Sequence, residues 1–269
     1  MVIIGNKYEI KALIGSGTFG KIYKGINIRT QEEVALKIEP INLETNSLKH
    51  ETKIYQYLNG TNGIPSLKWY GLDVNHRYMV INLLGDSLST LKKKYDVISL
   101  DVTIQIGLNA LEILKSIHEK GLIHRDIKPD NLLFGLKVDK KQLYLIDFGI
   151  CKRYVNDEGL HMEQKSVSKI IGSLNYCSIN SHNCMELSRR DDLISLGYVL
   201  IFLSCGKLPW ENISNTEKIK TQKVLLISNI SLPGIPNIFI QYLKYICNLE
   251  FHQKPNYEYI KNIFQEYKE

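Results

Sequence analysis

The residue pattern of this chain changes near residue 85, and this change constrains the fold more than any other feature does. Upstream of Gly85, short apolar runs bounded by turn residues predict β-strands, interrupted by a single helix. The predicted strands cover 8–14, 21–28, 33–39 and 78–83, and the helix covers 43–58. Downstream, apolar residues instead recur at a helical step along one face. The helices predicted there include 101–120, 192–205, 237–249 and 256–267.

The chain has no internal repeat, low-complexity stretch or flexible linker that would separate domains. Its 269 residues are enough for one large domain with a buried core. We therefore predict a single α+β domain over residues 1–269. A small β-rich lobe of about residues 1–83 is expected to connect through a short hinge to a larger helical lobe of about residues 84–269.

Cysteine usage and the absence of long apolar runs indicate an intracellular protein. The most apolar stretch, 193–203, is interrupted by Ser195 and Gly197 and predicts a buried helix rather than a membrane span. The first residues lack the basic region and long apolar core of a secretory signal. Five cysteines without CxxC spacing favour free thiols in a reducing compartment. We expect the cytoplasm or the nucleus, and no membrane partner.

The formal net charge of +6 leaves two interpretations of the surface open. The lysines can simply be solvated, or they can attract acidic or phosphorylated partners. No stretch alternates basic and aromatic residues as a nucleic-acid platform would, so we expect protein partners and no nucleic acid.

Two ordered motifs predict a phosphoryl-transfer site. Residues 124–131 read HRDIKPDN, and sixteen positions after the final Asn the triplet DFG begins at Asp147. Asp126 can accept the proton of an attacking hydroxyl, and Lys128 can neutralise charge on the transferred phosphoryl group. Asn131 and Asp147 can coordinate Mg²⁺ that bridges the phosphates of ATP.

A glycine-rich segment, GSGTFG at 15–20, lies between the first two predicted strands. A dinucleotide-binding fingerprint would require a helix after the third glycine, within a βαβ unit, so an NAD-dependent oxidoreductase is disfavoured. The pattern instead predicts a β-hairpin whose glycines let backbone amides approach nucleotide phosphates. The residues expected to bind the nucleotide here are Ile14, Gly15, Ser16, Gly17, Thr18, Phe19, Gly20, Lys21 and Ile22.

Lys37 lies inside an apolar strand, in the sequence VALK. It could be a surface lysine on an edge strand, but its position after the glycine-rich segment favours a grip on the α- and β-phosphates of ATP. Such a lysine needs an anionic partner, for which Glu51 on the following helix is the best candidate. Glu44, about two turns earlier on that helix, is its competitor.

Several longer segments carry a family resemblance. Most protein kinases have Ala-Pro-Glu where this chain reads SIN at 178–180. The strings SRRDDL at 188–193, SLGYVL at 195–200 and LLGDSL at 83–88 belong to the same pattern. With the motifs above, the chain resembles the eukaryotic protein kinases over essentially its whole length. Among them it most resembles the casein kinase I family.

This resemblance implies a bilobal protein-kinase fold and a serine/threonine protein kinase that uses Mg-ATP and acts on protein substrates as a monomer. It implies that the backbone of Leu84 binds adenine and that Asp192 braces the catalytic loop. The family usually works without phosphorylation of the activation segment and favours acceptors downstream of a phosphorylated or acidic residue. The chain ends at Glu269 directly after the last predicted helix, so we expect no regulatory C-terminal tail.

The chain departs from the family where priming phosphates are bound. Asn175 stands where the family usually has an anion-binding Arg, while Lys223 is expected to remain at that site. A second cluster retains Arg125 and Lys152, with Lys169 close to a third basic position. Loss of a bidentate guanidinium removes a charge-assisted contact, so we expect acidic substrates and a reduced reliance on phosphate priming.

The alternative to an active enzyme is a pseudokinase that binds a nucleotide or a partner. The sequence disfavours it, because a pseudokinase usually lacks one or more catalytic residues and this chain has them all. Ser166, Ser168 and Ser173 could be phosphorylated, but ordinary polar loop residues are the favoured interpretation.

Overall fold

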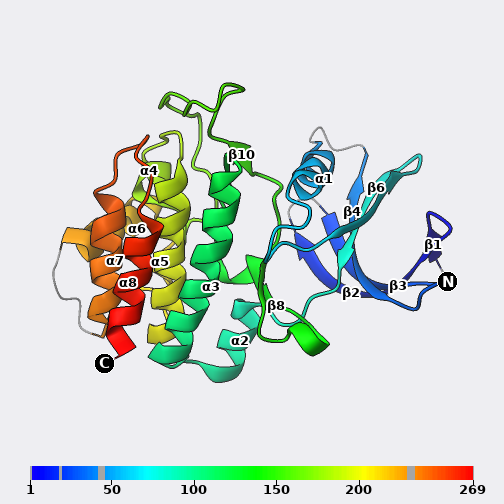
Figure 1. Ribbon diagram of the computed structural model, residues 1–269, viewed down its shortest axis with the longest axis horizontal. Helices are drawn as coiled ribbons and strands as arrows, with labels where there is room; N and C mark the ends of the chain where they lie inside the picture. Colours follow the sequence, from blue (N-terminus) through cyan, green and yellow to red (C-terminus); the bar gives the residue numbers. More distant parts are fainter. Residues whose placement is uncertain (1, 18–19, 42–45, 229–233, 269) are drawn as a thin grey trace. The chain divides into compact units, whose positions relative to one another are not determined.

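The computed structural model describes residues 2–17, 20–41, 46–228 and 234–268, and the chain divides into two compact units (Figure 1). The first unit comprises Met1–Gly85 and Phe134–Ile150, and the second comprises Asp86–Leu133 and Cys151–Glu269. The boundary between the two units at Gly85 lies close to the boundary expected between a β-rich and a helical lobe. The inclusion of 134–150 in the first unit differs from the expected lobes.

The first unit is built on a six-stranded antiparallel sheet with the strand order β1-β2-β3-β4-β6-β5. Its strands are β1 (Val2–Ile4), β2 (Tyr8–Gly17), β3 (Gly20–Asn27), β4 (Glu33–Pro40), β5 (Leu67–Leu72) and β6 (His76–Asn82). Alternate residues of β4 and β6 point to one face, where Val34, Leu36, Tyr78 and Val80 pack with Tyr8. The helix that follows β4 covers part of this sheet.

That helix, α1 (Ser47–Tyr57), packs beside β5 and β6. Its buried residues are Leu48, Glu51, Thr52 and Tyr55, the spacing of one helix face. The predicted helix begins at residue 43, but 42–45 lie outside the described residues. The apolar spacing that forms α1 therefore also carries a carboxylate, Glu51, to its buried side.

The segment 134–150 belongs to the first unit because of contacts that are distant in sequence. The strands next to and within this segment are β8 (Leu132–Phe134) and β9 (Leu143–Leu145). Within the first unit, Gly85 N donates to Phe134 O and Leu145 N donates to Gly63 O, each at 2.8 Å. The ring of Phe148 lies edge-on to Tyr55 of α1, with centroids 5.2 Å apart. These contacts bring Asp147 to α1.

The second unit is helical. Its helices are α2 (Leu88–Tyr95), α3 (Leu100–Glu119), α4 (Ile179–His182), α5 (Arg189–Cys205), α6 (Thr216–Ser228), α7 (Asn237–Cys247) and α8 (Tyr257–Gln265). Short 3₁₀ turns cover Pro129–Asn131, Lys137–Asp139 and Glu266–Lys268, the second of these lying in the first unit. The strands β7 (Leu122–Ile123) and β10 (Lys152–Arg153) pair with each other. The predicted helices at 101–120, 192–205, 237–249 and 256–267 correspond to α3, α5, α7 and α8.

Helix α5 is the centre of this unit and packs against both α3 and α7 (Figure 1). Ser188 and Asp191 form a capping box at its start, which satisfies backbone donors of the first turn. Gly197 allows the close approach of α7, because a Cβ at that position would lie 2.6 Å from Leu243 Cδ2. The apolar pattern of α5 therefore reflects burial on nearly all sides.

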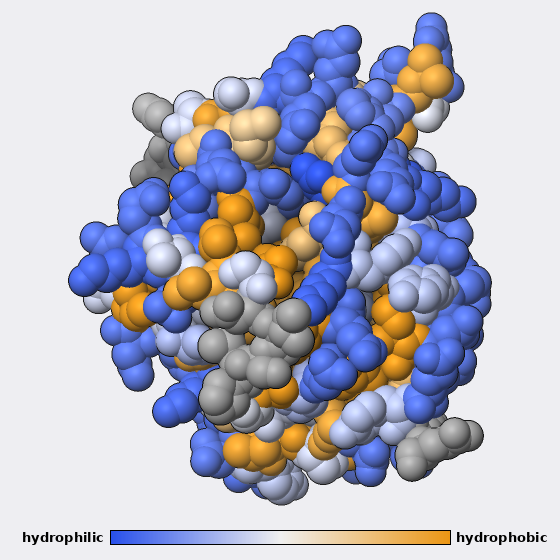
Figure 2. Space-filling model, turned by 90° about the vertical axis from the view of Figure 1, so that its left-hand side faces the viewer, coloured by the Kyte–Doolittle hydropathy of each residue, from blue (hydrophilic) through white to orange (hydrophobic). Residues whose placement is uncertain are grey.

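Hydrophilic side chains cover much of the outer face that carries the C-terminal helices, with apolar residues in separate patches (Figure 2). A groove of about 270 Å³ opens between α4, α5, α6 and α7, with Ile179, Ile194, Val224 and Cys247 among its lining residues. Within the described ranges, no helix combines the length and the apolarity needed to cross a lipid bilayer.

Candidate active site

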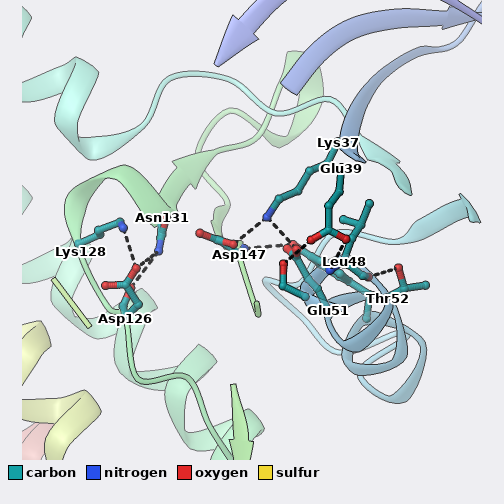
Figure 3. Close-up of polar contacts among 11 residues, drawn as sticks. Lys37, Glu39, Leu48, Glu51, Thr52, Asp126, Lys128, Asn131 and Asp147 are labelled. Atoms are coloured by element: carbon teal, nitrogen blue, oxygen red, sulfur yellow. Dashed lines mark hydrogen bonds and ion pairs between the residues drawn. The ribbon is translucent and has the colours of Figure 1, made fainter. Parts of the chain in front are cut away.

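In the first unit, Lys37 joins two carboxylates (Figure 3). Its Nζ donates to Glu51 Oε2 at 2.7 Å and to Asp147 Oδ1 at 2.9 Å. Lys37 lies on β4, which is paired on both sides, and its side chain is 15% exposed. The alternative of a surface lysine on an edge strand is therefore wrong. Glu51 is the partner, as predicted, while its competitor Glu44 lies outside the described residues.

The charges of this group stabilise one another. Burial alone would lower the pKa of Lys37, but the carboxylates of Glu51 and Asp147 outweigh burial and raise the pKa. Burial raises the pKa of Glu51, and the ammonium of Lys37 opposes that rise. Lys37 is thus a positioned cation, suited to bind an anion such as a phosphate group.

Glu39 anchors α1 to the strand that carries Lys37. It lies two residues after Lys37 on β4, on the same side of the strand, and is 1% exposed. Its Oε1 accepts from Ser47 Oγ at 2.9 Å, and its Oε2 accepts from Leu48 N at 3.2 Å (Figure 3). The first turn of α1 is held by a strand carboxylate, which places Glu51 within reach of Lys37.

The glycine-rich segment forms the predicted hairpin rather than a strand followed by a helix. Gly15 pairs with Ile22, and Gly17 with Gly20, across β2 and β3. A Cβ on Gly20 would lie 2.3 Å from Ile38 O, so the backbone itself requires this glycine. Ile14, Ser16 and Lys21 lie on the same hairpin, whereas Thr18 and Phe19 are outside the described residues.

Leu84 follows β6 and is partly buried. Among the hydrogen bonds found for the described residues, none uses a peptide group of Leu84. Its predicted contact with adenine stays a prediction.

In the second unit, Asp126 is the centre of a short catalytic loop (Figure 3). Lys128 Nζ donates to Asp126 Oδ2 at 2.6 Å. Asn131 Nδ2 donates to the backbone oxygen of Asp126 at 2.9 Å and to its Oδ2 at 3.4 Å. The structure therefore brings the predicted residues Asp126, Lys128 and Asn131 together.

Ser173 is a member of this group that the sequence indicates only as a polar loop residue. Its Oγ donates to Asp126 Oδ1 at 2.8 Å and accepts from Lys128 Nζ at 3.2 Å. Its backbone N also donates to Asp126 Oδ1, at 2.9 Å. Asp126 thus accepts a hydrogen bond from a hydroxyl that also contacts the ammonium of Lys128. A general base needs such a hydrogen bond to take up a hydroxyl proton. The dipeptide Gly172-Ser173 is too short a pattern to predict this contact from the sequence.

Asn131 in the second unit and Asp147 in the first each carry a side-chain oxygen of the kind that Mg²⁺ prefers. Mg²⁺ prefers carboxylate and amide oxygens and usually takes only one or two protein ligands beside substrate phosphates. Asn131 contacts Asp126 through Nδ2, so the amide oxygen Oδ1 is not the atom used in that contact. Asp147 has a side chain that is 37% exposed, and its φ of 66° turns the backbone sharply at this residue.

Asp192, at the start of α5, braces the catalytic loop as the resemblance implies. Its two carboxylate oxygens accept from the backbone N of His124 and of Arg125, each at 2.7 Å. Burial would raise the pKa of Asp192, but the hydrogen bond and charge of His118 help to lower it. Arg125 has a φ of 71°, which is strained for a residue other than glycine. Asp192 compensates that strain next to Asp126.

Lys223 does not form the expected anion site. It is fully buried, and its Nζ donates to Leu174 O at 2.6 Å and to Cys177 O at 2.7 Å. The rings of Tyr198 and Trp210 lie 5.1 and 5.4 Å from its Nζ. Burial lowers the pKa of Lys223 to about 8. The structure does not present Lys223 as an exposed cation, because α6 turns this lysine inward, where its Nζ already has backbone carbonyl partners in the segment around Asn175.

The second expected anion cluster already contains a carboxylate of the chain itself. Lys152 Nζ lies 2.6 Å from Glu186 Oε2, and Arg125 Nη1 lies 3.9 Å from Glu186 Oε1. Among the described residues, no ion pair joins Lys169 to Glu186. Arg125 and Lys152 are thus together as predicted, but Glu186 neutralises part of their charge.

The family model for the protein kinase domain matches residues 8–263, which is nearly the whole chain. The chain belongs to the protein kinases. Its fold is accordingly the bilobal protein-kinase fold, α+β in class, with a β-rich and a helical lobe. Protein kinases in general use ATP and Mg²⁺ and act on proteins. The groups around Lys37 and Asp126 contain residue types that such chemistry uses.

Proposed function

We propose that this kinase is an active serine/threonine kinase of the casein kinase I type. It transfers the γ-phosphate of Mg-ATP to hydroxyls of acidic protein substrates, and it relies little on phosphate priming. The observation that carries this proposal is the pair of contacts made by Ser173 Oγ. A serine hydroxyl is held at 2.8 Å from the carboxylate of Asp126 and 3.2 Å from the ammonium of Lys128.

In this proposal Asp126 orients the substrate hydroxyl and takes up its proton. Lys128 stabilises negative charge on the group being transferred. Both are held by neighbours, because Asn131 donates to Asp126 and Asp192 anchors the preceding peptides. A fixed donor and acceptor need little reorganisation during the reaction, which favours an active enzyme over a pseudokinase.

Mg-ATP supplies the electrophilic γ-phosphorus when it is bound. Lys37 would bind its α- and β-phosphates, oriented by Glu51, and the hairpin over 14–22 would cover them. Asn131 and Asp147 would each offer an oxygen to Mg²⁺. These assignments rest on donor type and on the contacts within each unit.

The cations of both clusters already have partners within the chain, which supports a weak dependence of activity on phosphate priming. Lys223 is buried against backbone carbonyls, and Glu186 lies against Lys152 and Arg125. Asn175 lacks a cationic group, and its backbone oxygen accepts from Trp210 Nε1 at 2.9 Å. A substrate phosphate would therefore have to compete with internal partners for its counter-charge.

The enzymatic proposal is tested by transfer of labelled phosphate from ATP to casein or to an acidic peptide, followed by identification of the labelled amino acid. We expect label on serine or threonine, and loss of transfer in Asp126→Asn. If the wild type and Asp126→Asn transfer equally little while both bind ATP, the protein is a binding module. Label on tyrosine would contradict the specificity.

The priming proposal needs matched peptides that carry either phosphoserine or serine upstream of the acceptor. We expect similar kcat/KM for both peptides. A large preference for the primed peptide would refute the proposal.

We also propose that the kinase is a monomer of the cytoplasm or nucleus that binds neither membranes nor nucleic acid. All five cysteines are free, which fits a reducing compartment. Size-exclusion chromatography with light scattering, and imaging of the tagged protein in cells, test these two points.

A further inference from the structure

The groove of the second unit between α4, α5, α6 and α7 is lined mainly by apolar side chains. Ile194 of α5 is 3% exposed and lies at its floor, whereas Val224 of α6 is 43% exposed and lies at its rim. Ile179 of α4 and Ile227 of α6 also line it. The groove therefore presents an apolar surface to the solvent, and an apolar ligand would remove that surface from water.

The lining also includes a buried hydroxyl that has no hydrogen-bond partner. Tyr198 of α5 lines the groove and is fully buried. Within the described parts of the chain, its Oη takes part in no hydrogen bond. The ring lies edge-on to Trp210, with centroids 5.1 Å apart, which fixes its position. A buried hydroxyl without a partner destabilises the fold, so a ligand that forms a hydrogen bond with it removes that penalty.

The hydroxyl of Tyr198 lies toward the Cys247 end of the groove. Burial raises the pKa of Tyr198 well above its usual value, and among the neighbouring residues Cys247 adds most to that rise. Burial also raises the pKa of the Cys247 thiol, to about 12, so the thiol is uncharged at neutral pH. Cys247 of α7 itself lines the groove. We therefore expect the polar contact of a ligand at this end and its apolar contacts along Val224 and Ile227.

The charges around this end favour a neutral ligand. None of the described residues that line the groove is charged. Arg190 and Asp191, at the start of α5, shift the pKa of Cys247 in opposite directions, so neither charge acts alone there. The carboxylate of Asp191 already accepts from Ser178 Oγ at 2.6 Å and from Asn180 Nδ2 at 2.8 Å. A charged ligand would lose hydration without gaining a counter-ion from the lining.

We propose that this groove is a binding site for a small neutral molecule that is mostly apolar and carries one hydroxyl or carbonyl oxygen. The oxygen accepts a hydrogen bond from Tyr198 Oη, and the apolar part lies against Ile194, Val224 and Ile227. The groove holds about 270 Å³. Sites for drug-sized ligands usually hold about 300–1,000 Å³, so a smaller ligand fits best. The site shares no residue with the Lys37 group or the Asp126 group and does not rest on the proposed function.

The test titrates the full chain, labelled with ¹³C in its isoleucine methyl groups, with 1-hexanol as the probe. The NMR signals of Ile179, Ile194 and Ile227 should shift and then saturate, because these residues line the groove. The signals of Ile10 and Ile38, on the sheet of the first unit, should stay in place. Hexanoate and hexylammonium have the same chain length but carry a charge, and we expect both to bind at least about tenfold more weakly.

Two valine variants make the position specific. Val224→Glu places a carboxylate at the rim and should weaken the binding of 1-hexanol at least about tenfold. Val102→Glu is the matched control, because Val102 is a similarly exposed valine on α3. It should bind 1-hexanol as wild type does.

Tyr198→Phe tests the hydroxyl by itself. It should weaken the binding of 1-hexanol about three- to tenfold, because it removes the hydrogen-bond donor. Without 1-hexanol, its melting temperature should equal or exceed that of wild type, since the hydroxyl has no partner in the free protein. A purely structural role of this hydroxyl would lower the melting temperature and leave the affinity for 1-hexanol unchanged.

Several outcomes would overturn the proposal. Shifts that do not saturate, or that spread equally over isoleucines of both units, would show non-specific solvation by the alcohol. Equal affinities for 1-hexanol and the charged analogues would contradict a neutral ligand. An unchanged affinity in Val224→Glu or in Tyr198→Phe would remove the groove or its hydroxyl from the site.

Discussion

The Lys37 group and the Asp126 group solve the problem of positioning charge in different ways. Lys37 and Asp147 are 110 residues apart in the chain, and Glu51 comes from a helix between them. Asp126, Lys128 and Asn131 lie within five residues of one another, and only Ser173 comes from far away. The first group therefore depends on the packing of α1 and of 134–150, while the second depends on the shape of one braced loop.

This difference predicts distinct consequences of mutation. Damage to the Asp126 group should affect the chemical step and leave nucleotide binding in place. Damage to the Lys37 group or to its supports should affect nucleotide binding and local stability as well.

The largest effect is expected from Asp126→Asn. It removes the proton acceptor while keeping the shape, so kcat should fall by about 10²–10⁴-fold, the typical contribution of a general base. ATP affinity, measured by calorimetry, should stay within about twofold of wild type. Lys37→Met is the contrasting variant, and it should weaken ATP binding too. A comparable loss of ATP affinity in both variants would abolish the distinction between the groups.

Ser173→Asp should have the next largest effect. A carboxylate at this position would repel Asp126 and compete for Lys128, so we expect kcat to fall by about 10–100-fold. Ser168→Asp is the matched control, because Ser168 is an exposed serine of the same segment. Steady-state kinetics on an acidic peptide measure both, and equal activity of the two variants would show that Ser173 plays no part in the Asp126 group.

Glu39→Gln tests the support of the Lys37 group. It removes a buried charge that holds the first turn of α1 and faces Arg77 at 3.6 Å. We expect an about 3–30-fold loss of kcat/KM for ATP and a loss of about 1–3 kcal/mol in the free energy of unfolding. Glu32→Gln, an exposed acid on the approach to β4, serves as control. If both variants bind ATP as wild type does, α1 is positioned without Glu39.

The smallest expected effect is the dependence of stability on pH that His182 contributes beside Lys223. Burial and the neighbouring Lys223 lower the pKa of His182 to about 4, and Lys223 Nζ lies 3.2 Å from its Nε2. The unfolded chain therefore binds a proton at a higher pH than the folded chain does. This contribution to stability is fully present above the unfolded-state pKa of His and is lost as pH falls from about 6.5 toward 4.

Urea unfolding as a function of pH measures this effect. We expect wild type to lose about 1–2 kcal/mol across that interval in excess of His182→Asn, which has no group that titrates there. Parallel pH profiles for the two proteins would show that His182 is not responsible.

The parts of the site that could be predicted are those carried by local pattern. Asp126, Lys128 and Asn131 are recognisable because one short loop holds all three at fixed spacing. The hairpin over 14–22 is recognisable because its glycines lie between two strand-like runs. The buried position of Glu51 is predictable because α1 has the spacing of an amphipathic helix, which turns this carboxylate toward the core.

The missed residues share a different property: their roles come from contacts with distant elements. Ser173 and Glu186 look like ordinary polar residues until the activation segment folds back onto the catalytic loop. Lys223 shows the same limit in the opposite direction. A lysine in a polar stretch predicts an exposed cation, yet the packing of α6 buries it against the carbonyls of Leu174 and Cys177.

The sequence by itself determined that this chain is a protein kinase, because the motifs that mark this family are local properties of the chain. It also determined the change from strands to helices near Gly85, since apolar periodicity specifies which faces must be buried. Only the tertiary structure decided which charges meet. Whether a lysine binds a substrate anion, a carbonyl or a carboxylate of its own chain depends on the neighbours that packing provides and on the desolvation they impose. For this reason Lys37 and Glu51 could be paired in advance, while the partners of Lys223 and of Glu186 appeared only in the folded protein.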